Sequence, residues 1–290
     1  MFRIQTMNKI SQRGLERFPQ DRYEVASELP RPDALLVRSA DLHDVKIPDT
    51  VKAIARAGAG YNNIPLDLCS KRGIVVFTTP GGNANAVKEL TLAALFLASR
   101  NILRGTAWVA ALADKGAAVP ELVERGKAQF EGSEIRGKVL GVVGLGAIGV
   151  LTANDALALG MEVIGYDPYI SVDAAWNLSR QVNRAETLEG LLAKADYVSL
   201  HLPLTDTTRG FFNAGKIRHL KHGARLINFA RGGLIHEEDL IAALQTGKLA
   251  LYVTDFPSVG LLSCPKAICL PHLGASTPEA EDNCAVMAVQ

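Results

Sequence analysis

The sequence predicts an α/β fold in which mainly parallel strands are covered by helices. The first observation is a strand, a Gly-x-Gly-x-x-Gly turn, a helix and a second strand that ends in an acid, all between Val139 and Asp167. The second is that short apolar runs alternate with helical segments along the rest of the chain. Strands that alternate with helices form parallel sheets with both faces covered. Because 290 residues exceed one typical core, we expect two domains.

The first third of the chain contains three predicted strands and a helix. Apolar runs that end in polar residues or glycine turns indicate strands over 34–39, 51–57 and 73–79. The segment 85–99 is rich in alanine and leucine and predicts a helix. Residues 100–136 are more charged, helical in pattern and interrupted by glycines, which indicates a connector between domains or between subunits.

The glycine turn is the strongest functional signal. Gly144 permits a tight turn after the strand, Gly146 lets backbone amides approach a pyrophosphate, and Gly149 lets the helix pack closely on the sheet. Phosphates then lie at the helix N-terminus, where unpaired N–H groups favour anions. Asp167 ends the next strand, where a carboxylate accepts hydrogen bonds from ribose hydroxyls and repels a 2′-phosphate. The pattern predicts a dinucleotide-binding unit that prefers NAD to NADP.

The last third repeats the alternation of strands and helices. Strands are predicted over 196–201, 224–229, 250–255 and 267–270, and helices over 186–194 and 237–246. Arg231, Asp255 and His272 follow the last three of these strands. Ligands of open α/β sheets bind beyond the carboxyl ends of the strands, so we expect these three side chains to converge on one crevice.

Composition and charge exclude several classes of function. The net charge is +1 without a charged block, which gives no indication of a nucleic-acid partner. No apolar run approaches the ~18 residues of a membrane span, and the N-terminus lacks the apolar region of a signal peptide. The four cysteines form no Cys-x-x-Cys pair, so we expect buried thiols in a reducing cytoplasm without a metal site or disulfide. These observations predict a cytoplasmic enzyme.

Three motifs occur in order along the chain: Gly144-Leu-Gly-Ala-Ile-Gly149, Asn228-Phe-Ala-Arg231-Gly-Gly233 and Pro271-His272-Leu-Gly-Ala-Ser276. The first third adds the loops Arg56-Ala-Gly-Ala-Gly-Tyr-Asn62 and Thr79-Pro-Gly-Gly-Asn83. Together they resemble the D-isomer-specific 2-hydroxyacid dehydrogenases over nearly the whole chain. The strongest likeness is to the branch that oxidises 3-phospho-D-glycerate with NAD, the reaction that opens serine biosynthesis.

The resemblance implies two Rossmann-like domains, each with a mainly parallel sheet flanked by helices, and an active site in the cleft between them. Residues 1–98 and about 275–290 are expected to form the substrate-binding domain, and 99–274 the NAD-binding domain. The resemblance also implies a homodimer formed through the NAD domain, with which the connector at 100–136 is compatible.

The resemblance assigns the chemistry to two residues. His272 is expected to take the hydroxyl proton as hydride leaves C2, and histidine suits this role because it ionises near neutral pH. Arg231 is expected to bind the substrate carboxylate, because a planar guanidinium matches a carboxylate with two hydrogen bonds.

The other expected site residues are divided by ligand. The cofactor residues are Gly144, Gly146, Ala147, Ile148, Gly149, Asp167, Leu202, Pro203, Thr208, Phe229, Ala230, Asp255 and Gly274. The substrate residues are Arg38, Ser39, Arg56, Ala59, Gly60 and Asn83. Among the latter, the amides of Ala59 and Gly60 resemble the family's second carboxylate contact, and the remaining four are candidates for a substrate phosphate.

The chain departs from the family pattern at one expected catalytic position. The usual Arg–Glu–His triad has its glutamate in Asp-Val-Phe-x-x-Glu-Pro, whereas this chain has Asp255-Phe-Pro-Ser-Val-Gly260 and no glutamate before His272. A carboxylate partner stabilises an imidazolium ion. Either His272 loses its proton more readily than in relatives, or Asp255 or a carboxylate from elsewhere takes the place of the glutamate.

The C-terminus also differs from the family pattern. The chain stops at Gln290, partway through an apparent helix. The resemblance implies a helix that returns to the substrate domain and, in many members, a serine-sensing domain, so either the sequence is truncated or the regulatory part is absent.

Two other functions fit the same residues. A reductase of glyoxylate, hydroxypyruvate or another 2-keto acid shares the motifs, and Arg38 and Asn83 favour a phosphorylated substrate only loosely. An NAD-sensing binding protein without turnover is the second alternative. The missing glutamate favours it, whereas the intact Arg231 and His272 oppose it.

Overall fold

The computed structural model describes residues 1–290 and contains two sheets built from parallel strand pairs. It divides into two compact units, one of Met1–Val87 with Gly274–Gln290 and the other of Lys88–Leu273. The sequence placed the corresponding boundaries at residues 98 and about 275. The predicted α/β fold with parallel sheets is confirmed.

The first unit contains a five-stranded sheet in the order β2-β1-β3-β4-β5. The strands are β1 (Phe2–Thr6), β2 (Tyr23–Ala26), β3 (Ala34–Val37), β4 (Ala53–Arg56) and β5 (Val75–Phe77). The helices are α1 (Gln12–Leu15), α2 (Leu66–Arg72), α12 (Pro278–Val289) and the start of α3 (Ala84–Ser99).

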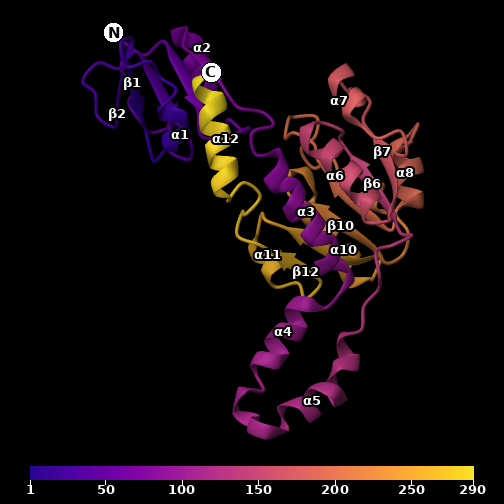
Figure 1. The fold of residues 1–290 in the computed structure, drawn as a ribbon. Helices are drawn as coiled ribbons and strands as arrows, with labels where there is room; N and C mark the ends of the chain where they lie inside the picture. The colour runs from indigo at the N-terminus through magenta and orange to yellow at the C-terminus, as the bar shows by residue number, and fades with distance from the viewer. The chain divides into compact units, whose positions relative to one another are not determined.

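Both faces of the first sheet are covered. Leu35 and Leu36 are neighbours on β3, so their side chains point to opposite faces. Leu35 belongs to an apolar cluster with Ile54, whereas Leu36 packs in a second cluster with Ala285 of α12. The yellow α12 lies beside α1 (Figure 1), and a Cβ added to Gly14 would lie 2.6 Å from the Ala285 backbone. The last helix therefore closes one face of the sheet.

The second unit contains a seven-stranded sheet in the order β12-β11-β10-β9-β6-β7-β8. The strands are β6 (Val139–Val143), β7 (Glu162–Tyr166), β8 (Asn183–Arg184), β9 (Tyr197–Leu200), β10 (Ala224–Asn228), β11 (Leu249–Thr254) and β12 (Ala267–Cys269). The α-helices are α4 (Ile102–Ala110), α5 (Val119–Gly126), α6 (Ala147–Ala158), α7 (Val172–Asn177), α8 (Leu188–Lys194), α9 (Ala214–Ile217), α10 (Glu237–Gln245) and α11 (Val259–Leu262). Three 3₁₀ turns are η1 (Ala113–Ala118), η2 (Lys127–Phe130) and η3 (Gly232–Leu234).

Helices cover both faces of the second sheet. Gly141 and Val142 are neighbours on β6 and face opposite sides. A Cβ added to Gly141 would collide with Leu191 of α8, whereas the Val142 side chain lies close to Gly149 of α6. Because α6 and α8 lie on opposite faces, the strands between them are buried on both sides.

The predicted connector forms a helical arm of the second unit. Helices α4 and α5 are joined by η1 and followed by η2 (Figure 1). The rings of Trp108 and Phe130 pack at a centroid distance of 5.3 Å. No residue of α4, η1 or α5 is buried. The arm therefore has no core of its own within this chain.

Some elements differ from the sequence expectations. Strands β1, β2 and β8 were not predicted. The residues of β1 and β2 are mostly half-exposed, and β8 consists of two exposed residues that pair with β7, so none of the three carries a continuous apolar run. The expectation of four buried thiols is also wrong, because Cys264 and Cys269 are only half-buried. These two cysteines lie near the sheet edge formed by β12, where fewer elements cover them.

No helix is long and apolar enough to cross a membrane. No cluster of three or more His, Cys, Asp or Glu side chains is arranged to hold a metal ion.

Candidate active site

One edge of the second sheet collects the predicted cofactor and catalytic segments. All strands of this sheet are parallel, so the segments that follow them meet at the same edge. Gly144 follows β6, Asp167 follows β7, and Leu202 lies just beyond β9. Arg231 and His272 come after β10 and β12, with only β11 between these two strands.

The glycine turn has the geometry that a dinucleotide requires. Gly144 has φ 93°, and its amide donates to the Tyr166 carbonyl at 2.9 Å. A Cβ there would lie 2.6 Å from the His201 carbonyl oxygen, and a Cβ on Gly149 would collide with the Gly144 carbonyl. Gly146 is the N-cap of α6, is exposed, and has no heavy atom within 4 Å of an added Cβ. Open space at this helix N-terminus fits a pyrophosphate.

Ala147 and Ile148 form the first turn of α6 directly after this N-cap. Ala147 is exposed and Ile148 is half-buried, so both lie beside the open space. Their role in lining a pyrophosphate stays a prediction.

Two backbone amides fix the carboxylate of Asp167, which the sequence predicts to bind a ribose. Its Oδ2 accepts from the Leu145 amide at 2.8 Å, and its Oδ1 accepts from the Tyr169 amide at 2.8 Å. Each carboxylate oxygen keeps a second lone pair for a hydroxyl donor. Pro168 and Tyr169 are exposed and bring no positive charge to balance a 2′-phosphate. The site therefore fits NAD.

The loop after β9 contains three further predicted cofactor residues, Leu202, Pro203 and Thr208. The Thr208 hydroxyl donates to the Pro203 carbonyl at 2.6 Å and closes the loop.

His201 lies directly before this loop. Burial lowers the pKa of His201 to about 4, and its ring Nε2 lies 2.9 Å from the Ser199 hydroxyl. His201 is therefore neutral near pH 7.

Asn228 shapes the turn that carries Arg231. This fully buried residue donates from Nδ2 to the Arg231 carbonyl at 2.9 Å and accepts from the Ala230 amide at 3.1 Å. The Arg231 guanidinium donates to the Ala230 carbonyl at 2.6 Å, and Phe229 is buried beside it. Asn228 was not among the predicted site residues, although an asparagine at a strand end in Asn-Phe-Ala-Arg-Gly-Gly is a signal for such a turn.

His272 is the one non-glycine residue with a positive φ, which is 43°. Its amide donates to the carbonyls of Asp255 and Leu270, each at 3.1 Å. Its ring lies 5.0 Å from the Phe256 ring, and Phe256 also packs against Gly232 of the Arg231 turn. Sparsely populated backbone conformations cluster at functional sites. Phe256 thus connects the two predicted catalytic loops.

A carboxylate occupies the space next to the position of the missing glutamate. The family spacing places that glutamate at Gly260, where an added Cβ would lie 2.5 Å from Oε1 of Glu237. Glu237 is in the first turn of α10, six residues after Arg231. Glu237 also acts on Cys269 at the end of β12. Burial, Cys264 and the negative charge of Glu237 together raise the pKa of the Cys269 thiol. Glu237 was not among the predicted site residues.

The predicted substrate residues lie in the first unit, at the carboxyl edge of its sheet. Arg38 and Ser39 follow β3, Arg56 ends β4, and Ala59 and Gly60 are in the next loop. Arg56 donates to the Arg38 carbonyl at 3.1 Å and to the Gly60 carbonyl at 2.7 Å, which links the two strand ends.

Asn83 lies in the loop before α3, and its Oδ1 is buried without a hydrogen-bond partner. An unsatisfied buried oxygen of this kind is costly and is often explained by a missing ligand or water.

Gly274 is the one predicted cofactor residue that does not lie in the second unit. It begins the C-terminal segment of the first unit.

Comparisons with known proteins support a family assignment. Residues 92–274 match the family described as D-isomer specific 2-hydroxyacid dehydrogenase, NAD binding domain. The chain is 36% identical over 274 residues to the D-3-phosphoglycerate dehydrogenase of Mycobacterium leprae (strain TN), which covers 90% of this chain and 49% of that protein. The chain therefore spans about half the length of the curated relatives it matches.

Solved structures show the same fold. The structure is similar to an NAD⁺-bound 3-phosphoglycerate dehydrogenase of Entamoeba histolytica, with TM-score 0.77 and 26% identity over 99% of this chain and 93% of that one. A glyoxylate reductase from Paecilomyes thermophila has TM-score 0.77 and 25% identity, again over 99% and 93%. The chain belongs to the D-isomer-specific 2-hydroxyacid dehydrogenase family, and its cofactor is NAD.

Proposed function

We propose that this protein oxidises 3-phospho-D-glycerate to 3-phosphohydroxypyruvate with NAD. The observation that carries this proposal is the shared sheet edge, where the Arg231 turn and His272 follow strands of the same sheet as the NAD turn. The name of the Mycobacterium leprae relative supports the phosphorylated substrate. Arg38 and Arg56 in the first unit supply cations suited to a terminal phosphate.

The residues of this chain would divide the reaction between binding and proton transfer. Bound NAD⁺ supplies the acceptor for the hydride that leaves C2. His272 takes the proton of the C2 hydroxyl as the carbonyl forms, and Arg231 holds the carboxylate and polarises the C2 oxygen. Glu237 is our candidate for the carboxylate that positions His272. The homodimer and the cytoplasmic location stay predictions.

A reductase of unphosphorylated 2-keto acids is the second candidate. The similarity to a glyoxylate reductase supports it. The ion pair between Arg38 and Glu281, with 2.7 Å between its atoms, also supports this candidate. The Glu281 carboxylate already binds the guanidinium that is proposed to bind a phosphate.

The test is a kcat/KM panel for NADH oxidation with 3-phosphohydroxypyruvate, hydroxypyruvate and glyoxylate. The first two acids differ only by the phosphate. We expect at least a tenfold preference for the phosphorylated acid, and Arg38→Gln should remove this preference without changing the rate with hydroxypyruvate, because a remote contact contributes only where its group exists. Equal or higher kcat/KM with the unphosphorylated acids would favour the reductase. Tight NADH binding without turnover of any acid would favour an NAD-sensing protein.

A further inference from the structure

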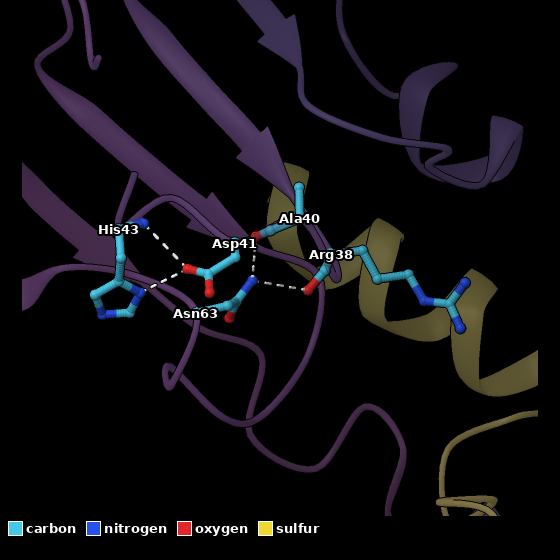
Figure 2. Close-up of polar contacts among 5 residues, drawn as sticks. All are labelled: Arg38, Ala40, Asp41, His43 and Asn63. Atoms are coloured by element: carbon cyan, nitrogen blue, oxygen red, sulfur yellow. Dashed lines mark hydrogen bonds and ion pairs between the residues drawn. The ribbon is translucent and has the colours of Figure 1, made fainter. Parts of the chain in front are cut away.

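The backbone of Arg38 is held from three sides at the end of β3. Its carbonyl accepts from Arg56 Nε at 3.1 Å and from Asn63 Nδ2 at 3.3 Å, and its amide donates to Asn8 Oδ1 at 2.9 Å. Figure 2 shows the side chain extending from this anchored backbone across the yellow ribbon of α12, away from Asp41 and His43. The direction of the guanidinium is therefore set by the fold and by its partner on α12.

That partner is Glu281. Its Oε1 lies 2.7 Å from Arg38 Nη2, and the two side chains are 33% and 35% exposed. The carboxylate accepts from the same guanidinium that we propose binds the substrate phosphate. The neighbouring Asp282 has a different role, because it accepts from the Ser11 hydroxyl at 2.5 Å and pairs with Arg13 at 3.3 Å, which ties α12 to α1.

A phosphate and the Glu281 carboxylate compete for Arg38. A phosphate monoester carries a charge near −2 at pH 7. Bound at Arg38, it would lie within a few ångströms of a second anion, and like charges at this distance repel even where water reaches both groups. The phosphate therefore has to displace Glu281 or share the guanidinium with it.

We propose that Glu281 is an internal competitor for the phosphate subsite and sets the selectivity for the remote group of the substrate, an inference that rests on the proposed function. Glu281 occupies Arg38 in the free protein and lowers its affinity for any phosphate. A phosphorylated hydroxy acid offsets this cost through its carboxylate and hydroxyl contacts. Inorganic phosphate has no such contacts, so the same loss of affinity leaves it only weakly bound.

The experiment compares wild-type enzyme, Glu281→Gln and the matched control Asp282→Asn, which changes the next residue of the same helix. KM is measured for 3-phosphohydroxypyruvate and for hydroxypyruvate, together with the inhibition constant of inorganic phosphate. We expect Glu281→Gln to lower KM for the phosphorylated acid and the phosphate inhibition constant, each by about fivefold, a size set by a partly exposed ion pair. KM for hydroxypyruvate should stay unchanged, and Asp282→Asn should leave the ratio of the two KM values as in wild type.

Two results would overturn the inference. One is an unchanged ratio of KM values in Glu281→Gln. The other is an equal shift in Asp282→Asn, which would show that loosening α12 is sufficient. If wild-type enzyme turns over only unphosphorylated acids, the proposed function fails, and the phosphate inhibition constant then judges Glu281 alone: a fivefold decrease supports the competitor role, and no decrease rejects it.

Discussion

At the residue scale, the chain has a glycine where the family pattern has a glutamate, and a carboxylate from another helix lies beside that glycine. Gly260 lies where the family pattern has glutamate, and Glu237 of α10 lies within 2.5 Å of the missing Cβ. A carboxylate next to a catalytic histidine stabilises the imidazolium that forms when the hydroxyl proton is taken. Glycine at 260 leaves room that any larger residue would take from Glu237. We therefore regard Gly260 and Glu237 as a compensating pair.

This interpretation predicts that Glu237→Gln lowers kcat about tenfold, while KM for the acid and Kd for NADH stay unchanged. The split is expected because a positioning residue acts through His272 rather than on either ligand. Steady-state kinetics and NADH fluorescence titration measure it. Glu238→Gln is the control, because Glu238 is the next residue of α10 and is exposed. Equal rates in the two variants, or a loss confined to Asp255→Asn, would assign the role elsewhere.

Single residues differed in how much of their role the sequence could reveal. Arg231 and His272 were identifiable as candidates because each lies in a short motif directly after a predicted strand, although their catalytic roles stay predictions. Asn228 and the Arg38–Glu281 pair were not, because their roles depend on contacts across a turn or between segments 243 residues apart, a separation that follows from their numbers. Local pattern cannot specify such contacts.

At the element scale, two glycines of the turn from β6 into α6 have different surroundings. Gly149 has no room for a methyl group, because its Cβ would collide with the Gly144 carbonyl, whereas Gly146 faces open space. The strand, turn and helix were all predicted from local sequence because hydrophobic period and glycine spacing are local signals. The two-residue β8 was not, because it exists only through pairing with β7.

The two glycines predict opposite phenotypes for the same substitution. Gly146→Ala should raise Kd for NADH at least tenfold, because a methyl group would enter the space for the pyrophosphate. Its free energy of unfolding should fall by less than about 1 kcal/mol, the usual cost of alanine at an N-cap. Gly149→Ala should lose about 1–3 kcal/mol of stability through overpacking. Denaturant unfolding and NADH titration measure the two effects, and unchanged NADH affinity in Gly146→Ala would place the pyrophosphate elsewhere.

At the scale of the whole molecule, the helical arm is the part whose stability the chain does not explain. The arm, residues 100–136, contains no buried residue in α4, η1 or α5, and the Trp108–Phe130 contact is its one aromatic pair. Ordering such a segment costs conformational entropy that buried apolar area normally offsets. The sequence indicated a helical connector but not its missing core, because burial is a property of the folded chain.

A second copy of the chain would supply the missing cover, so we expect a homodimer of twice the 31.0 kDa chain mass that buries the arm. Ile102 and Leu103 are each 47% exposed at the start of α4, and apolar side chains at this exposure are suited to an interface core. The double variant Ile102→Glu/Leu103→Glu should sediment as a monomer at concentrations where wild type is dimeric. Lys115→Glu, on the exposed η1 turn, is the control and should remain dimeric. Sedimentation velocity makes the measurement. A monomeric wild type would contradict the dimer, and a dimeric double variant would place its interface elsewhere than at Ile102 and Leu103.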